Sequence, residues 1–277
     1  MLFSEALKWA ILALKESPTP ALDARILLEF ASNKPFWKID LKENITPEAL
    51  LNFQTLIQRR ALKEPVAYIT CTKGFYGFDF TVSQDVLIPR PDSEIIVQTA
   101  IEIASNFKEP CQITDLCTGS GALIISVLST LNNDIFFGTG VDISEKALKI
   151  AEINKAKIFP SKNLSFINAD IKNFEINADI VISNPPYIPS EEIKTLEENV
   201  KNFEPKIALD GGKDGLYFYR IIAERAKKAK FIILEIGFGQ AKDISDIFLQ
   251  EGYELQSIKK DLSQIERCLV FINKILP

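Results

Sequence analysis

The chain has 277 residues, 47% of them hydrophobic and 25% charged, as in a folded globular protein large enough for one large and one small domain. It contains no histidine, which excludes Ser-His-Asp and Cys-His triads, imidazole base catalysis and histidine-rich zinc sites. We therefore expect no metal site. The net charge of −5 argues against nucleic acid as a partner, because proteins that bind phosphate backbones usually carry a basic face.

The apolar runs and the cysteines predict a cytoplasmic protein without a membrane segment. Runs such as Ile232–Leu234 are too short to cross a bilayer, and Met1–Glu5 has neither the basic nor the apolar region of a secretory signal. The four cysteines form no Cys-x-x-Cys pair and are expected to pack as apolar side chains: Cys71, Cys111, Cys117 and Cys268.

The first quarter of the chain predicts a small helical bundle. A second helix is expected over residues 21–28, after Pro18 and Pro20 interrupt the first. A third is expected after Thr46, a suitable N-cap followed by Pro47. We assign residues 1–63 to this helical domain. The first helix is indicated by apolar residues at helical spacing: Phe3, Leu7, Ile11 and Leu14.

Composition changes after this region. Residues 66–82 are rich in aromatic and β-branched side chains and contain Gly74 and Gly77, which predicts a β-hairpin. We assign residues 64–84 to a hairpin linker.

The remainder, 85–277, alternates short apolar strands with amphipathic helices, which predicts an α/β fold with a mostly parallel, doubly wound sheet. The last two strands have no long helix between them, so we expect an antiparallel edge to a seven-stranded sheet. The expected strands are 113–116, 136–142, 164–168, 180–183, 231–236, 253–258 and 268–275, and the expected helices are 122–131, 145–155 and 217–228.

A glycine-rich loop follows the first of these strands, at the sheet edge where ligands bind in such folds. In Asp115-Leu116-Cys117-Thr118-Gly119-Ser120-Gly121, the glycines permit a sharp turn and close approach to a ligand. Taken alone, the loop is equally consistent with a structural turn or a dinucleotide site.

Two acidic residues narrow the choice of ligand. Asp142 ends the second strand, where it can accept both ribose hydroxyls, and Asp170 follows the third, where it can accept from an adenine amine. Each alone could be a helix N-cap or a turn residue. Ile124 replaces the third glycine of a dinucleotide motif, and the loop lacks a P-loop lysine. A nucleoside without pyrophosphate fits better, so we predict S-adenosylmethionine, with S-adenosylhomocysteine as product. The candidate cofactor-binding residues are Asp115, Cys117, Thr118, Gly119, Ser120, Gly121, Asp142, Asp170, Ile171 and Asn184.

The fourth strand runs into Asn184-Pro185-Pro186-Tyr187, the candidate catalytic residues. Two prolines end the strand and stiffen the loop, which is also the structural alternative. An amide nitrogen is a poor nucleophile because its lone pair is delocalised. The Asn184 side-chain oxygen and the Pro185 carbonyl can each accept one N–H of such a nitrogen. Tyr187 offers a flat face to a planar group. The nitrogen becomes acidic after methylation, so a histidine base is not needed.

Several segments together resemble the peptide-chain release factor N5-glutamine methyltransferases (HemK/PrmC type). The resemblance implies a Rossmann-like class I methyltransferase domain behind the helical domain. It also implies methylation of the glutamine in the Gly-Gly-Gln motif of class 1 release factors, modulating translation termination, with the N-terminal helices contacting that partner. The matching segments are Glu64–Ile69, Ile88–Glu94, the glycine loop, Ser183–Ile188, Phe203–Pro205, Ala208–Leu209, Gly211–Leu216 and Leu234–Gly237, with Asp23–Arg25 and Leu27–Leu28 in the helical region.

Other interpretations stay open at this point. Asn-Pro-Pro-Tyr also occurs in adenine-N6 DNA and guanine-N2 RNA methyltransferases. A non-catalytic cofactor-binding protein and a Rossmann oxidoreductase are further alternatives. Cys117 stands where the family more often has glycine. Arg90 could hold a carboxylate of cofactor or substrate, or pair with Asp92 or Glu94; spacing leaves the roles of Glu204 and Glu235 undecided as well.

Overall fold

The computed structural model describes residues 1–261 and 263–273, and its contacts divide them into two compact units. The first unit comprises residues 1–72 and 197–203, and the second the rest of the described chain. Within the described residues, none of the helices is long and apolar enough to cross a membrane.

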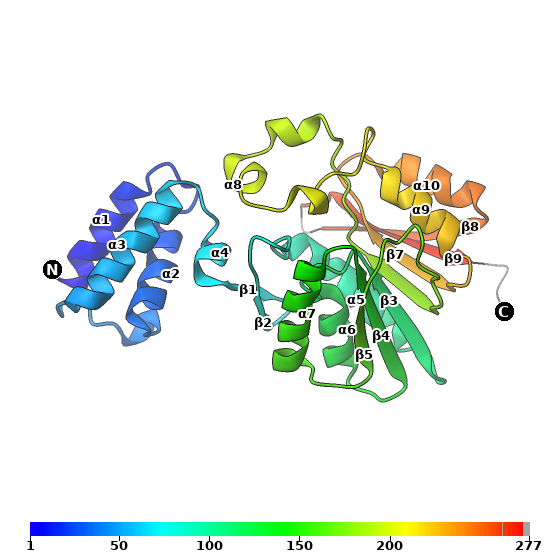
Figure 1. Cartoon of the computed structure of the whole chain (residues 1–277), viewed down its shortest axis with the longest axis horizontal. Coiled ribbons are helices and arrows are strands. Elements are labelled where there is room, and N and C mark those ends of the chain that lie inside the picture. Colours follow the sequence, from blue (N-terminus) through cyan, green and yellow to red (C-terminus); the bar gives the residue numbers. More distant parts are fainter. Residues whose placement is uncertain (262, 274–277) are drawn as a thin grey trace. The chain divides into compact units, whose positions relative to one another are not determined.

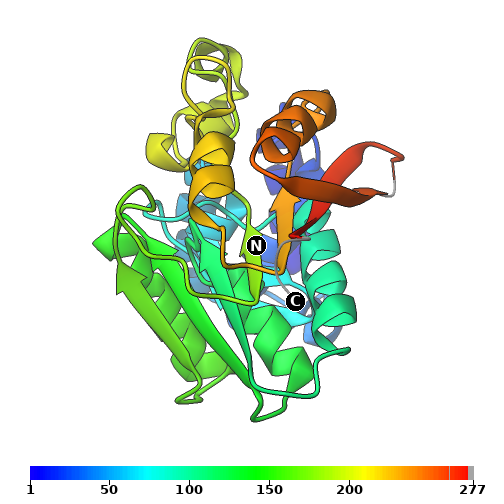
Figure 2. The same ribbon diagram turned by 90° about the vertical axis from the view of Figure 1, so that its right-hand side faces the viewer.

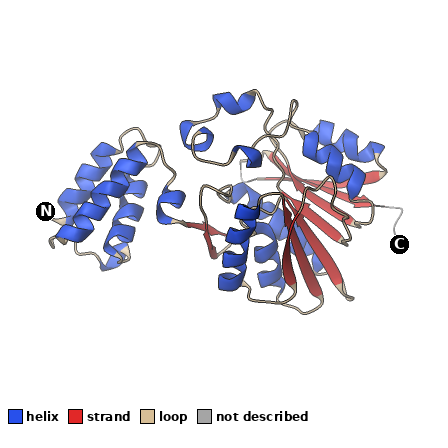
Figure 3. Cartoon of the chain, in the orientation of Figure 1, coloured by secondary structure: helices blue, strands red, loops and turns tan. Residues whose placement is uncertain are grey.

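The first unit contains the predicted helical bundle (Figures 1 and 3). Helices α1 (Phe3–Ala13), α2 (Pro20–Ser32) and α3 (Pro47–Ala61) pack around a common apolar core. The α3 start is as predicted, because the Thr46 hydroxyl accepts a hydrogen bond from the Ala49 amide at 3.3 Å. The unit also contains η1 (Phe36–Lys38) and α8 (Glu198–Lys201).

A buried ion pair joins the helices of the first unit. The Arg60 side chain on α3 donates to the Asp23 carboxylate on α2 at 2.7 Å, and both side chains are less than 10% exposed. Ser17 and Thr19, between α1 and α2, donate to the same carboxylate at 2.7 and 2.9 Å. The carboxylate is thus fully hydrogen-bonded, as a buried charge requires.

The linker differs in part from the predicted hairpin. Residues 72–81 do form one, from β1 (Thr72–Phe75) and β2 (Phe78–Thr81). The prediction was wrong for Val66–Thr70, which form the short helix α4 after Pro65. The Thr70 hydroxyl donates to the Val66 carbonyl, and Cys71 ends the helix in the left-handed conformation. Local hydrogen bonding therefore outweighs the strand preference of these residues.

The second unit contains a seven-stranded sheet in the order β5-β4-β3-β6-β7-β9-β8, which confirms the predicted fold class. The first five strands in this order are parallel, β9 is antiparallel to β7, and the edge strand β8 pairs antiparallel with β9. Residues 274 and 275 of the last predicted strand lie outside the described residues. The strands are β3 (Cys111–Leu116), β4 (Phe136–Asp142), β5 (Leu164–Asn168), β6 (Ile180–Ser183), β7 (Phe231–Glu235), β8 (Tyr253–Lys260) and β9 (Glu266–Asn273).

Helices cover both faces of this sheet (Figures 1 and 2). On β6, Ile180 and Ile182 belong to the core under α5 and α6, whereas Val181 belongs to the core under α9 and α10. Because both faces of the sheet are covered here, every residue of the inner strand β6 is buried, whereas the edge strand β5 is largely exposed. The helices are α5 (Glu94–Ala104), α6 (Ala122–Leu131) and α7 (Glu145–Ile158) on one face, and α9 (Tyr217–Arg225) and α10 (Ala241–Gln250) on the other.

The sequence pattern assigned no element to α5 or α10. In α5, the β-branched run Ile95–Val97 favours a strand locally. Ile96, Val97, Ala100 and Ala104 are nevertheless buried at helical spacing against α6 and the sheet. Tertiary packing therefore decides the conformation. Short helical turns complete the unit: η2 (Pro91–Ser93), η3 (Glu192–Thr195) and η4 (Lys206–Ala208).

Candidate active site

The site lies where the sheet changes its winding direction. From β3 the chain adds β4 and β5 on one side, and from β6 it adds β7 on the other, so β3 and β6 are adjacent at the switch point. Such a point opens a crevice at the carboxyl ends of the strands. Here the Ser183 hydroxyl donates to the Leu116 carbonyl at 2.6 Å, which joins the two strand ends.

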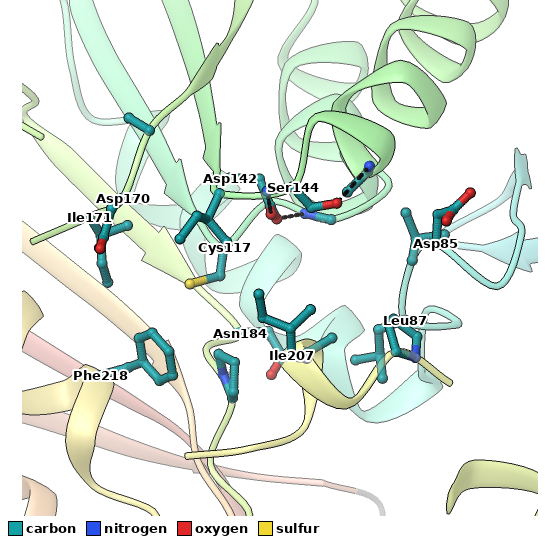
Figure 4. Close-up of a pocket in the computed structure, with 18 of the residues that line it drawn as sticks. Asp85, Leu87, Cys117, Asp142, Ser144, Asp170, Ile171, Asn184, Ile207 and Phe218 are labelled. Carbon is teal, nitrogen blue, oxygen red and sulfur yellow. Dashed lines mark hydrogen bonds between the residues drawn. The ribbon is translucent and has the colours of Figure 1, made fainter. Parts of the chain in front are cut away.

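A pocket opens at this crevice (Figure 4), and the structure brings most of the predicted ligand-binding residues together in it. Asp115, Thr118, Ser120 and Gly121 do not line it, and neither do Pro185 and Tyr187. The predicted residues that do line it are Cys117, Gly119, Asp142, Asp170, Ile171, Asn184 and Pro186.

The glycine loop owes its shape to three residues with positive φ: Cys117 at 59°, Gly119 at 55° and Gly121 at 77°. A Cβ added to Gly119 would meet none of the described atoms within 4 Å, so this residue faces open space in the pocket. A Cβ added to Gly121 would come within 2.9 Å of Ile125, so here glycine permits close packing at the start of α6.

Residues behind the loop support it from the protein interior. Asp115 is fully buried and accepts a hydrogen bond from the Thr118 hydroxyl at 2.6 Å. Burial raises the pKa of Asp115 to about 7, because it penalises the charged form. Asn154 on α7, which sequence reasoning missed, donates to the Ser120 carbonyl at 2.9 Å and to the Thr81 carbonyl of β2. These side chains position the loop; Asp115 and Thr118, which were predicted to bind the cofactor, do not line the pocket.

The two predicted acidic residues lie at the same edge of the sheet, with Asp142 ending β4 and Asp170 following β5. The Asp142 carboxylate accepts the backbone N–H of Gly119 and of Ser144, each at 2.9 Å. Burial raises the pKa of Asp142, and these hydrogen bonds oppose the rise. An ionised carboxylate retains further acceptor positions for ligand hydroxyls. Asp170 accepts the Lys172 N–H at 3.0 Å and lines the pocket with Ile171.

The other walls come from segments that sequence reasoning did not assign to the site. Leu87, Ile207 and Phe218 are labelled around the pocket in Figure 4 and add apolar surface. They come from three segments far apart in the chain: before η2, in η4 and in α9. All three segments adjoin motifs noted for the family resemblance, but spacing alone gave no sign that they meet.

The Asn184 loop is held by buried polar groups. Asn184 donates through its amide nitrogen to the Ser93 hydroxyl at 3.2 Å. The Tyr187 hydroxyl makes a long contact of 3.5 Å with Glu235, and the Gln240 amide donates to the Tyr187 carbonyl at 3.0 Å. Ser93 and Glu235 both stand in segments of the family resemblance, but the sequence assigned neither of them a role.

Arg90 has a partner other than those weighed from the sequence. Its guanidinium pairs with Glu204, whose carboxylate also accepts the Ile88 N–H at 3.4 Å. Neither Asp92 nor Glu94 pairs with it: Asp92 lies 3.5 Å from Arg267, and Glu94 accepts the Tyr76 N–H. The residue that binds Arg90 lies 114 positions away in the chain, so short spacing could not reveal it.

The doubly wound sheet and its pocket are those of a class I methyltransferase, and residues 107–234 match the family model described as Methyltransferase domain. Residues 5–70 match the model described as PrmC N-terminal domain. The chain is 40% identical to the release factor glutamine methyltransferase of Thermodesulfovibrio yellowstonii, over 82% of each chain, and 36% identical to that of Clostridium acetobutylicum, over 90% of each. The chain belongs to the release factor glutamine methyltransferase family.

Three further comparisons define the extent of the similarity. A bifunctional methyltransferase of Rickettsia conorii is 37% identical over 91% of this chain, which spans 54% of that relative. Among solved structures, a methyltransferase from Pyrococcus furiosus gives a TM-score of 0.53 at 18% identity, over 80% of this chain and 98% of that one. The hMettl16 catalytic domain, solved with an RNA hairpin, gives 0.56 at 12% identity, over 85% and 84%. At these identities the structures share the fold.

Proposed function

We propose that this protein transfers a methyl group from S-adenosylmethionine to the side-chain amide nitrogen (N5) of the glutamine in the Gly-Gly-Gln motif of class 1 release factors, and so modulates translation termination. The observation that carries the proposal is one pocket in which Asn184 and Pro186 lie beside the glycine loop and Asp142. Relatives named release factor glutamine methyltransferases support the choice of acceptor.

The residues of the pocket fit the proposed cofactor. Asp142 can accept ribose hydroxyls, Asp170 can accept the adenine amine, and Ile171 and Phe218 offer apolar surface. Gly119 leaves room for close approach of a ligand. When bound, the cofactor supplies an electrophilic methyl group.

Asn184 provides the polar contact to the acceptor. With its amide nitrogen bonded to Ser93, its oxygen can accept one N–H of a glutamine amide, and the Pro185 carbonyl can accept the other. Two fixed acceptors orient the nitrogen lone pair toward the methyl group, and such positioning supplies roughly 7–11 kcal/mol in favourable cases. The proton leaves to water after transfer, so a general base is not required.

We further infer that residues 1–63 form the substrate-recognition domain, 64–84 the linker and 85–277 the methyltransferase domain. The match of residues 5–70 to the PrmC N-terminal model supports the first assignment. Large exposed apolar side chains in this region, such as Leu12 and Trp37 at 75% and 77% exposure, suit protein contact.

The decisive experiment is mass spectrometry of a class 1 release factor after incubation with the protein and S-adenosylmethionine. We expect one added methyl group on the Gly-Gly-Gln glutamine. Asn184→Ala should lower the rate roughly 100- to 1000-fold, the usual effect of losing one preorganised hydrogen-bonding group. It should leave the melting temperature close to that of the unmodified protein.

The same experiment tests the alternatives. Methyl-free DNA and RNA are incubated in parallel with labelled cofactor. Label in nucleic acid alone would replace the proposal by an adenine or guanine N-methyltransferase. Cofactor binding without transfer to any acceptor would indicate a regulatory protein, and binding of NAD instead would indicate an oxidoreductase.

A further inference from the structure

A buried carboxyl group lies behind Asn184 without an assigned role. Glu235 ends β7 and is 2% exposed. Its carboxylate accepts a hydrogen bond from the Ser93 hydroxyl at 2.5 Å, and Ser93, 4% exposed, accepts one from the Asn184 amide at 3.2 Å. The three side chains form a continuous chain of hydrogen bonds, the Asn184–Ser93–Glu235 relay, that ends in the pocket.

We propose that Glu235, acting through Ser93, fixes the Asn184 amide with its oxygen toward the pocket, where it accepts a hydrogen bond from the acceptor amide. Both are positioning residues. This inference rests on the proposed function, because it concerns how the same site orients its acceptor.

The number of protons that each group can donate fixes the orientation of the Asn184 amide. An ionised carboxylate can only accept hydrogen bonds, and a serine hydroxyl has one proton to give. With Glu235 ionised, the Ser93 proton is committed to the carboxylate. Ser93 can then only accept from Asn184, so the Asn184 NH2 group must face Ser93 and its oxygen must face the pocket. A flipped amide would leave two acceptors opposed in a buried site, which is unfavourable.

Protonation of Glu235 removes this constraint. A protonated carboxyl can donate to Ser93, which frees the Ser93 proton to donate to the Asn184 oxygen. The amide can then turn its NH2 group toward the pocket, where it repels the N–H of the acceptor. The orientation that favours methyl transfer therefore requires the ionised form of Glu235.

The surroundings place this protonation near neutral pH. Burial raises the pKa of Glu235 to about 7, opposed mainly by the Ser93 hydrogen bond and the Arg267 charge. Asp92 adds a smaller upward effect on this pKa. The titratable and charged groups that face Glu235 from neighbouring elements are Asp92, Tyr187, Tyr219, Arg267 and Cys268.

The main test is the pH profile of kcat for methylation of a Gly-Gly-Gln peptide at saturating cofactor. In the unmodified protein we expect kcat to fall about tenfold per pH unit below an apparent pKa near 7. Glu235→Gln and Ser93→Ala should lower kcat at pH 8 at least tenfold and abolish this dependence, with cofactor Kd unchanged. Ser93→Thr keeps the hydroxyl, so this variant should retain both the kcat at pH 8 and the pH dependence of the unmodified protein.

The matched control is Ser245→Ala. Ser245 is also a buried serine, and its hydroxyl donates to the Ala241 carbonyl within α10, away from the pocket. We expect its kcat and pH profile to match those of the unmodified protein. If Ser93→Ala behaves like this control, or keeps the pH dependence, the relay is refuted.

A substrate-free readout separates this inference from the proposed function. The Asn184 side-chain NH2 signals, assigned in the nitrogen–proton spectrum by their loss in Asn184→Asp, should shift with an apparent pKa near 7. The shift should vanish in Ser93→Ala. Signals that do not titrate would overturn the relay, even if the unmodified protein methylates the peptide. If it methylates no release factor but the signals titrate, only the proposed function fails.

Discussion

Asp23 of the helical unit and two carboxylates of the second unit, Asp115 and Glu235, are buried in different ways. In the helical unit, Asp23 is paired with Arg60 and accepts two further hydroxyl donors, so its charge is satisfied. In the second unit, burial raises the pKa of Asp115 and of Glu235 to about 7. Neither carboxylate makes a direct ion pair with a described cation. One buried carboxylate is thus satisfied by its partners within the helix packing, whereas burial raises the pKa of the other two beside the candidate active site.

The largest effect should come from breaking the satisfied pair. Asp23→Ala leaves the Arg60 charge buried without its partner, and we expect the helical unit to lose about 3–5 kcal/mol of stability. Denaturant unfolding measures this. The control is Glu16→Ala, which removes an exposed pair with Lys63 and should change stability by less than about 1 kcal/mol. Equal effects would show that the buried pair contributes no more than a surface pair.

Removing a strained charge from the second unit should have the opposite sign. Because the pKa of Glu235 lies above its ordinary 4.5, the folded chain binds this proton more tightly than the unfolded chain. The contribution to stability is present at low pH and is lost as pH rises from about 4.5 to about 7. At about 1.4 kcal/mol per pKa unit, Glu235→Gln should gain up to about 3 kcal/mol at pH 8 and almost nothing at pH 4.

Urea unfolding at both pH values measures this difference. The variant should combine higher stability with the lower kcat expected for the relay. A variant that is less stable than the unmodified protein at pH 8 would contradict the view that Glu235 is held ionised at a cost.

Backbone strain gives a finer comparison, because each unit has a cysteine at positive φ: Cys71 at 54° and Cys117 at 59°. A left-handed conformation costs a non-glycine residue roughly 1–2 kcal/mol. Replacement by glycine removes this cost, but glycine loses more conformational entropy on folding, which offsets part of the gain in stability. Cys71→Gly and Cys117→Gly should therefore each change stability by about 1 kcal/mol or less. Only Cys117→Gly removes a side chain from the pocket.

Calorimetric titration with cofactor distinguishes the two variants. We expect Cys117→Gly to keep or improve the affinity by a few-fold, and Cys71→Gly to leave it unchanged. A large loss of cofactor affinity in Cys117→Gly would mean that the Cys117 side chain itself makes a contact that stabilises the bound cofactor.

The smallest effect concerns the surface of the helical unit. Trp37 is 77% exposed, so replacing it should not change the core. If this unit recognises the release factor, Trp37→Ala should raise KM several-fold for the intact factor and leave KM for a short Gly-Gly-Gln peptide unchanged. Phe238→Ala, an equally exposed aromatic of the second unit at 81%, serves as comparison. Equal changes in KM for the intact factor and the peptide would show that Trp37 does not take part in recognition of the factor.

The sequence predicted most of the elements because their signals are local. Strands 136–142, 164–168 and 180–183 were predicted with their observed bounds, since each is a short run rich in apolar residues that can be recognised locally. Helix α5 was missed because its β-branched residues favour a strand until α6 and the sheet pack against it. The hairpin prediction was wrong for residues 66–70 for the opposite reason. Here hydrogen bonds within one helical turn outweigh the preference of these residues for a strand.

By itself, the sequence determined the kinds of chemistry available: the absence of histidine, the glycine loop, acidic strand ends and Asn184 after β6. Each is a short-range pattern, and each strand end meets the others because parallel strands share one edge. Only the tertiary structure decided what surrounds Asn184. Ser93 lies 91 positions from Asn184 and 142 from Glu235, so their hydrogen bonds exist only once α5 packs on the sheet. Burial removes Glu235 from water and so raises its pKa. Composition alone does not predict this burial, because it depends on the tertiary packing around Glu235.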